Sequence, residues 1–122
     1  MTRGAGADAA TGEWPWQVPL ATLEGFGGNH GVPPGGISLG GPIATAGGLV
    51  FIAGTLDPHL RAFDVETGRE LWSAELPAAG NATPMTYKVS AAGKQYVVIA
   101  AGGHAKVSES RIGDTLVAFA LP

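Results

Sequence analysis

Apolar residues fall into short runs along the chain, and the two longest runs do not alternate with polar residues. Residues 49–53 and 96–100 are continuously apolar, as expected of inner strands that are covered on both faces. Gly-rich turns precede both runs, at Gly47-Gly48 and at Ala92-Gly93-Lys94. The pattern predicts strands at 14–20, 42–45, 49–53, 60–65, 69–76, 83–87, 96–100 and 115–121.

These strands group into units. Residues 42–76 carry four strands and form one complete antiparallel unit, while 83–121 carry three strands of another. Residues 13–20 have the character of an outer strand from a preceding unit, and the Gly and Pro residues of 21–41 leave little scope for regular structure. The chain is therefore expected to be all-β, with about two four-stranded blades.

A strand-turn-strand motif ends in tryptophan at Trp72. It runs Ala62-Phe63-Asp64-Val65-Glu66-Thr67-Gly68-Arg69-Glu70-Leu71-Trp72, and a looser copy has Gly6, Asp8, Thr11, Gly12 and Trp16 at the same offsets. Glycine suits the positive φ of a tight turn, and the Asp and Thr side chains can bond its free backbone groups. Recurrence at a fixed interval of this size indicates a repeat architecture such as a propeller.

Composition narrows the class. The chain has 122 residues, 45% of them hydrophobic, with a net charge of −3 and no basic patch, so nucleic acid is not an expected partner. Twenty Gly and nine Pro residues favour short strands and turns over helices. The absence of cysteine excludes disulfides and thiolate metal sites within these residues, and neither a signal peptide nor a membrane-spanning run is expected in this segment.

The motif resembles the tryptophan-docking motif of the pyrroloquinoline quinone (PQQ) dehydrogenases. The resemblance implies an eight-bladed β-propeller of the quinoprotein alcohol dehydrogenase type, in which the tryptophan of one blade packs on the alanine region of the next. We therefore expect Trp72 to be largely buried near Ala118, and Trp16 to pack against the region of Ala62.

The resemblance extends beyond the fold at three stretches. They are 39–51, with Leu39-Gly40-Gly41-Pro42-Ile43; 82–87, with Ala82-Thr83-Pro84-Met85-Thr86-Tyr87; and 93–104, which ends in Ala101-Gly102-Gly103-His104. They look like the C-terminal part of membrane-bound PQQ-dependent glucose and polyol dehydrogenases. This implies oxidation of an aldose or polyol with PQQ and calcium or magnesium, transfer of electrons to ubiquinone, and a parent protein on the periplasmic face of the inner membrane.

By the same resemblance, Asp57 and His104 correspond to residues at the PQQ site. Both fall in loops that leave inner strands, the usual place for residues at a propeller mouth. Each also has an ordinary structural interpretation, Asp57 as a turn residue before Pro58 and His104 as a loop histidine. Arg61 and Lys106 could meet a cofactor carboxylate, but solvated surface charge is the favoured interpretation.

No catalytic residue or metal ligand is expected in this segment, because the family's base and metal ligands lie in other blades, so the isolated chain should be inactive. The departures at 29–34 and 105–111 leave the substrate open. A non-catalytic propeller-repeat scaffold is the alternative function. Gly36-Ile37-Ser38-Leu39-Gly40 matches a hydrolase elbow only by chance, because Pro and Gly residues on both sides prevent the strand and helix that it needs.

The expected partners are the remaining blades of the parent protein. The incomplete unit at 83–121 exposes an unpaired strand edge, which is a template for another chain. Because 14–20 is expected to be an orphan strand, the chain is also expected to self-associate by strand exchange.

Overall fold

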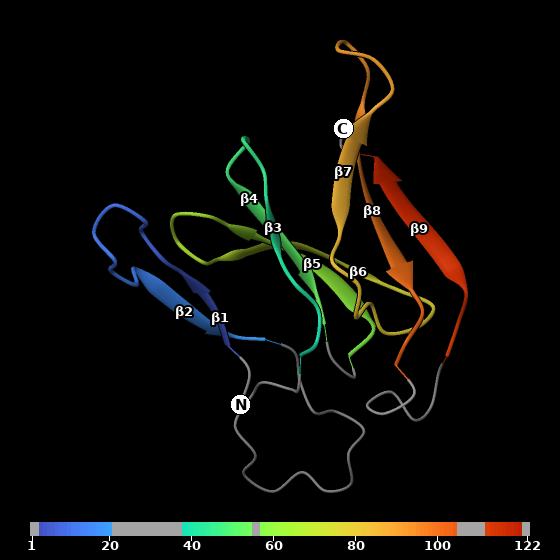
Figure 1. Cartoon of the computed structure of the whole chain (residues 1–122), viewed down its shortest axis with the longest axis horizontal. Coiled ribbons are helices and arrows are strands. Elements are labelled where there is room, and N and C mark those ends of the chain that lie inside the picture. The colour runs from blue at the N-terminus through green and yellow to red at the C-terminus, as the bar shows by residue number, and fades with distance from the viewer. Residues whose placement is uncertain (1–2, 21–37, 55–56, 105–111, 121–122) are drawn as a thin grey trace, which may run out of the picture.

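The computed structural model describes residues 3–20, 38–54, 57–104 and 112–120. These residues form three antiparallel sheets and no helix. The first sheet pairs β1 (Arg3–Gly6) with β2 (Trp16–Pro19), and the third has the order β7 (Met85–Lys88), β8 (Gln95–Ala101) and β9 (Thr115–Ala120). The middle sheet has the order β3 (Ile43–Ala44), β4 (Leu49–Ala53), β5 (His59–Asp64) and β6 (Glu70–Glu75). The three sheets lie side by side in chain order (Figure 1).

The all-β prediction is confirmed, and the strand predictions agree with the structure to within two residues at each end. The exception is β1, which the sequence pattern did not predict. Gly6 is directly opposite Trp16 in this pair, and Gly4 is opposite Val18. The expectation that 14–20 is an orphan strand is therefore wrong. Strand exchange through β2 would have to use its second edge, because the first edge is paired with β1.

The main hydrophobic core lies between the middle and third sheets. It is formed by Phe51, Ala53, Leu60, Ala62, Leu76, Val97, Ile99 and Ala101, none of them more than 2% exposed. A smaller cluster joins Leu20 to Ile52 and Phe63 on the opposite face of the middle sheet. Both faces of β4 and β5 are thus covered, which explains why residues 49–53 are apolar without alternation.

Trp16 ties the first sheet to the middle one. Its indole lies against Gly6 of its own motif and against Gly68 of the next. The approach is so close that a Cβ added to either glycine would come within 2.5 to 2.6 Å of ring atoms. The indole Nε1–H donates to the carbonyl oxygen of Val65 at 2.8 Å. Trp16 thus docks on the turn that follows Ala62. The expected packing against the region of Ala62 is confirmed, with the contacts made to Val65 and Gly68.

Trp72 has a different environment. Trp72 is directly opposite Ala62 on the neighbouring strand, as Trp16 is opposite Gly6. Its ring makes a T-shaped contact with the Phe119 ring, with centroids 5.1 Å apart. The ring thus lies on the strand that carries Ala118, as expected, with the contact made to the Phe119 side chain. The expected burial is wrong, because Trp72 is 38% exposed and borders an apolar cavity of about 360 Å³. The counterpart of Val65 in the third sheet is Leu121, which lies outside the described residues.

Candidate functional site

The two residues predicted to line a cofactor site follow equivalent strands of neighbouring sheets. β4 and β8 both run toward the lower edge of the molecule in Figure 1, and Asp57 and His104 come after them. Loops at one edge of adjacent blades commonly carry binding residues, because a rigid sheet positions them. This edge is therefore the candidate site.

Asp57 is buried, with 8% of its surface exposed. Its carboxylate oxygens have separate partners: Oδ1 is 2.5 Å from Nδ1 of His59, and Oδ2 accepts a hydrogen bond of 2.5 Å from Nη2 of Arg61. The backbone supports this turn, since the N–H of His59 donates to the Asp57 carbonyl and that of Leu76 donates to the Pro58 carbonyl. A buried carboxylate is tolerated when its oxygens are paired in this way.

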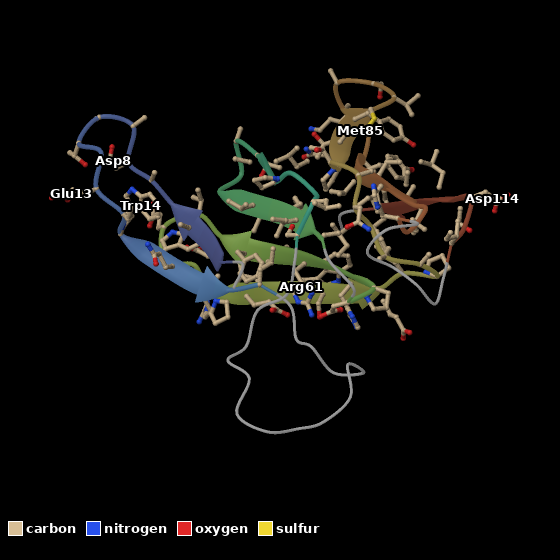
Figure 2. All side chains as sticks on the ribbon, turned by 60° about the horizontal axis from the view of Figure 1, so that its bottom comes forward. Asp8, Glu13, Trp14, Arg61, Met85 and Asp114 are labelled. Atoms are coloured by element: carbon tan, nitrogen blue, oxygen red, sulfur yellow. The ribbon has the colours of Figure 1, made fainter. Side chains whose placement is uncertain are left out.

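Arg61 links Asp57 to the outermost strand of the middle sheet. Its Nε lies 3.5 Å from Oε2 of Glu70, and its side chain is only 15% exposed. Figure 2, which brings the lower edge of Figure 1 forward, shows Arg61 on the middle sheet, well away from Met85 and Asp114 on the third sheet. The interpretation of Arg61 as solvated surface charge is therefore wrong. It is the cation that compensates Asp57.

His104 is exposed, in contrast to Asp57. The loop before it is fixed at its base, because Gly103 adopts a φ of 67° and donates its N–H to the Ala79 carbonyl at 2.8 Å. Gly113, beyond the undescribed residues 105–111, donates to the Gly102 carbonyl at 3.0 Å. The Gly-Gly pair thus holds His104 at the end of β8. Lys106 lies outside the described residues.

Sequence reasoning missed the role of His59. Alternate residues of a strand share one face, so His59 and Arg61 are placed on the same side of β5, two and four residues after Asp57. The Asp-x-His-x-Arg alternation was the available signal. Ser38 of the rejected hydrolase motif lies in a loop, where its hydroxyl is 3.5 Å from the Gly40 carbonyl oxygen.

The donor set fits part of a PQQ site. PQQ is anionic through its carboxylates, and the exposed His104 can offer it a hydrogen-bond donor at this edge, while Arg61 offsets the charge of Asp57. Within the described part of the chain, no group of three His, Cys, Asp or Glu side chains is arranged to hold a metal ion. No described helix is long and apolar enough to cross a membrane.

Comparison with known proteins identifies the family. The family described as "PQQ: Glucose/ethanol/alcohol dehydrogenase, beta-propeller domain" matches residues 2–97. The chain belongs to the PQQ-dependent quinoprotein dehydrogenase family. It is 48% identical over 122 residues to quinoprotein glucose dehydrogenase A of Acinetobacter calcoaceticus, which covers 97% of this chain and 15% of the relative. It is 54% identical over 94 residues to quinoprotein glucose dehydrogenase of Escherichia coli, covering 77% of this chain and 11% of the relative.

Other quinoprotein relatives differ in the substrate that their names state. A probable quinate dehydrogenase (quinone) of Xanthomonas campestris pv. juglandis is 48% identical over 120 residues, covering 94% of this chain and 15% of the relative. Among solved structures, the quinohemoprotein alcohol dehydrogenase of Comamonas testosteroni superposes with a TM-score of 0.63 at 27% identity, covering 93% of this chain and 15% of that one. The propeller prediction is thereby confirmed. The chain spans roughly one seventh of the length of these quinoprotein relatives.

Proposed function

We propose that this chain forms part of a quinoprotein dehydrogenase that oxidises an aldose sugar or a polyol with PQQ and passes the electrons to ubiquinone. The 48% identity to quinoprotein glucose dehydrogenase A along nearly the whole chain carries the proposal. The retained Ala-Gly-Gly-His sequence, with its Gly103 anchor and exposed His104, also supports it. No observation favours the alternative of a non-catalytic scaffold.

Asp57 and His104 are the proposed contributors to the cofactor site. The equivalent positions of their loops after β4 and β8 support this assignment. When bound, PQQ would supply the two-electron oxidation. We assign the binding of calcium or magnesium, and the general base, to other parts of the dehydrogenase, and we place the enzyme at the periplasmic face of the inner membrane by family likeness.

The remaining blades are the proposed partners of the third sheet. The far face of the third sheet corresponds to the covered face of the middle sheet. Its residues Val98, Leu116 and Ala118 are equivalent to Phe51, Leu60 and Ala62, in that order. Leu116 is 70% exposed there, whereas Leu60 is fully buried. Met85 and Tyr87 extend the same apolar face. A further sheet of the same kind would cover this surface, as the third sheet covers the middle one.

A chimera tests the function. This chain would replace the matching segment of the Escherichia coli quinoprotein glucose dehydrogenase, and the protein would be assayed for PQQ-dependent, metal-dependent oxidation of glucose and of polyols. We expect activity in the chimera and none in the isolated 122-residue chain. A folded, membrane-inserted chimera that neither binds PQQ nor oxidises any of these substrates would contradict the proposal.

Variants of the chimera test the site. Asp57→Ala should weaken PQQ binding, measured by titrating the apoenzyme, and His104→Ala should change cofactor affinity or substrate preference. Ser90→Ala, in the exposed turn between β7 and β8, is the control. If both site variants titrate like the parent chimera, the assignment of Asp57 and His104 is wrong.

A further inference from the structure

Asp57 and His59 form a carboxylate-imidazole pair with one buried and one accessible member. The Asp57 side chain is 7% exposed and that of His59 is 36% exposed. Because Nδ1 faces the buried Oδ1 of Asp57 at 2.5 Å, Nε2 is the ring nitrogen that remains for another partner. The pair therefore has a fixed inner contact and an outer nitrogen.

The contact determines where the proton lies on a neutral imidazole. A carboxylate only accepts hydrogen bonds, so Nδ1 must carry hydrogen to bond with Oδ1, and Nε2 is left with its lone pair. The second oxygen of Asp57 is held by Arg61, which is itself 3.5 Å from Glu70. Asp57 therefore cannot turn away from His59 without also losing its ion pair with Arg61.

Charged neighbours surround the pair on the strands that contact it. Arg61 lies on the same face of β5, Glu70 approaches Arg61 from β6, and Glu75 is directly opposite His59 on β6. Arg61 and His59 both contact Asp57, and Glu75 offers a second, exposed carboxylate opposite His59. Glu75 is accordingly a natural control for the effect of negative charge alone.

We propose that Asp57 is a positioning residue which fixes the Nδ1–H tautomer of His59, and that Nε2 of His59 accepts a hydrogen bond from a hydroxyl group of the substrate. The second half rests on the proposed function, since a sugar or polyol supplies the hydroxyl donor. Asp57 then acts on the site through His59, and its own oxygens stay bound to His59 and Arg61.

The tautomer can be measured without any cofactor. In the 122-residue chain labelled with ¹⁵N-histidine, long-range ¹H–¹⁵N spectra recorded where imidazole is neutral should show His59 in the Nδ1–H form. The signal is assigned by its loss in His59→Gln. Asp57→Ala should abolish the preference and Glu75→Gln should keep it. An Nε2–H form in the unaltered chain, or a tautomer unaffected by Asp57→Ala, would overturn the proposal.

Substrate binding is tested in the chimera described above. His59→Phe should raise KM for the sugar about three- to tenfold, the range for one lost neutral hydrogen bond, with kcat and PQQ affinity unchanged. His59→Gln, which places an amide oxygen near the Nε2 position, should recover most of the loss. If His59→Phe leaves the KM of an active chimera unchanged, the proposed hydrogen bond between His59 and the substrate is wrong, and the tautomer proposal is unaffected. A chimera that binds no PQQ would refute the proposed function, while the tautomer measurement would still decide the role of Asp57.

Discussion

Trp16 and Trp72 occupy the same motif position but have different surroundings. Trp16 is held between Gly6 and Gly68, and it donates a hydrogen bond to Val65 across two sheets. Trp72 meets the Phe119 ring in a T-shaped contact, remains 38% exposed and borders an apolar cavity of about 360 Å³. Beside Trp16 lies the turn of the next motif, which contains Gly68. The equivalent turn for Trp72 is not among the described residues.

This difference shows that the motif supplies only one half of the docking site. The tryptophan and the small residue opposite it come from one motif, as in the pairs Gly6 with Trp16 and Ala62 with Trp72. The other half, a glycine and a carbonyl oxygen, comes from the next motif along the chain. Burial of the ring is therefore a property of the contact between repeats.

Replacing the two tryptophans should give the largest contrast. Trp16→Ala should destabilise the chain by about 3 kcal/mol, as expected for a large aromatic side chain packed against its neighbours. Trp72→Ala should cost about half as much, because its ring remains partly in solvent. Urea unfolding followed by far-UV circular dichroism measures both. Equal losses would mean that the two rings contribute alike despite their different contacts.

The glycines of the two turns should respond differently to a methyl group. Gly68 and Gly12 both have positive φ, at 69° and 73°, but a Cβ on Gly68 would lie 2.6 Å from the Trp16 ring and one on Gly12 meets nothing within 4 Å. Gly12→Ala should cost about 1 kcal/mol from backbone strain. Gly68→Ala should cost about 3 kcal/mol, because overpacking adds to that strain.

Comparable unfolding midpoints for Gly68→Ala and Gly12→Ala would contradict docking of Trp16 on this turn. The double variant Gly68→Ala, Trp16→Ala sharpens the test. Once the ring is absent, the excess cost of the Gly68 substitution should disappear, since only the backbone strain remains.

The indole hydrogen bond should contribute less than the packing of the ring. Trp16→Phe keeps an aromatic ring between the two glycines and removes the Nε1–H that donates to Val65. The expected loss is about 1 kcal/mol. Trp72→Phe, with no described counterpart of Val65 beside it, should be less costly in the same unfolding experiment. A larger loss at position 72 would reverse the comparison.

The smallest effect is expected from the turn that Trp16 contacts. Hydrogen bonds from the backbone N–H and hydroxyl of Thr67 hold the pKa of Asp64 below its usual value of 3.8. The ionised form is thus favoured in the folded chain, so this stability is present above pH 3.8 and is lost as pH falls through the lower folded pKa. Asp64→Asn should remove this dependence. A stability difference that is independent of pH would show that the charge is not involved.

The edge that carries the candidate site was predictable in part. Residues 49–53 and 96–100 identify the two inner strands, and the loops after them follow directly, so the placement of Asp57 and His104 after these strands was predictable from the sequence. His59 was missed because a histidine at the start of a strand has no distinctive spacing by itself. Arg61 was misjudged because its burial depends on Asp57 and on Glu70, which comes from a different strand.

The sequence by itself determined the short strands, the tight turns at Gly12 and Gly68, and the likeness to quinoprotein dehydrogenases, because these depend on local backbone preferences and on residue order. Only the tertiary structure decided that β2 pairs with β1, that Trp16 docks on Gly68 while Trp72 stays partly exposed, and that Asp57 is shared between His59 and Arg61. Those outcomes depend on which groups from separate strands come within hydrogen-bonding or van der Waals distance, and one-dimensional spacing does not specify such distances.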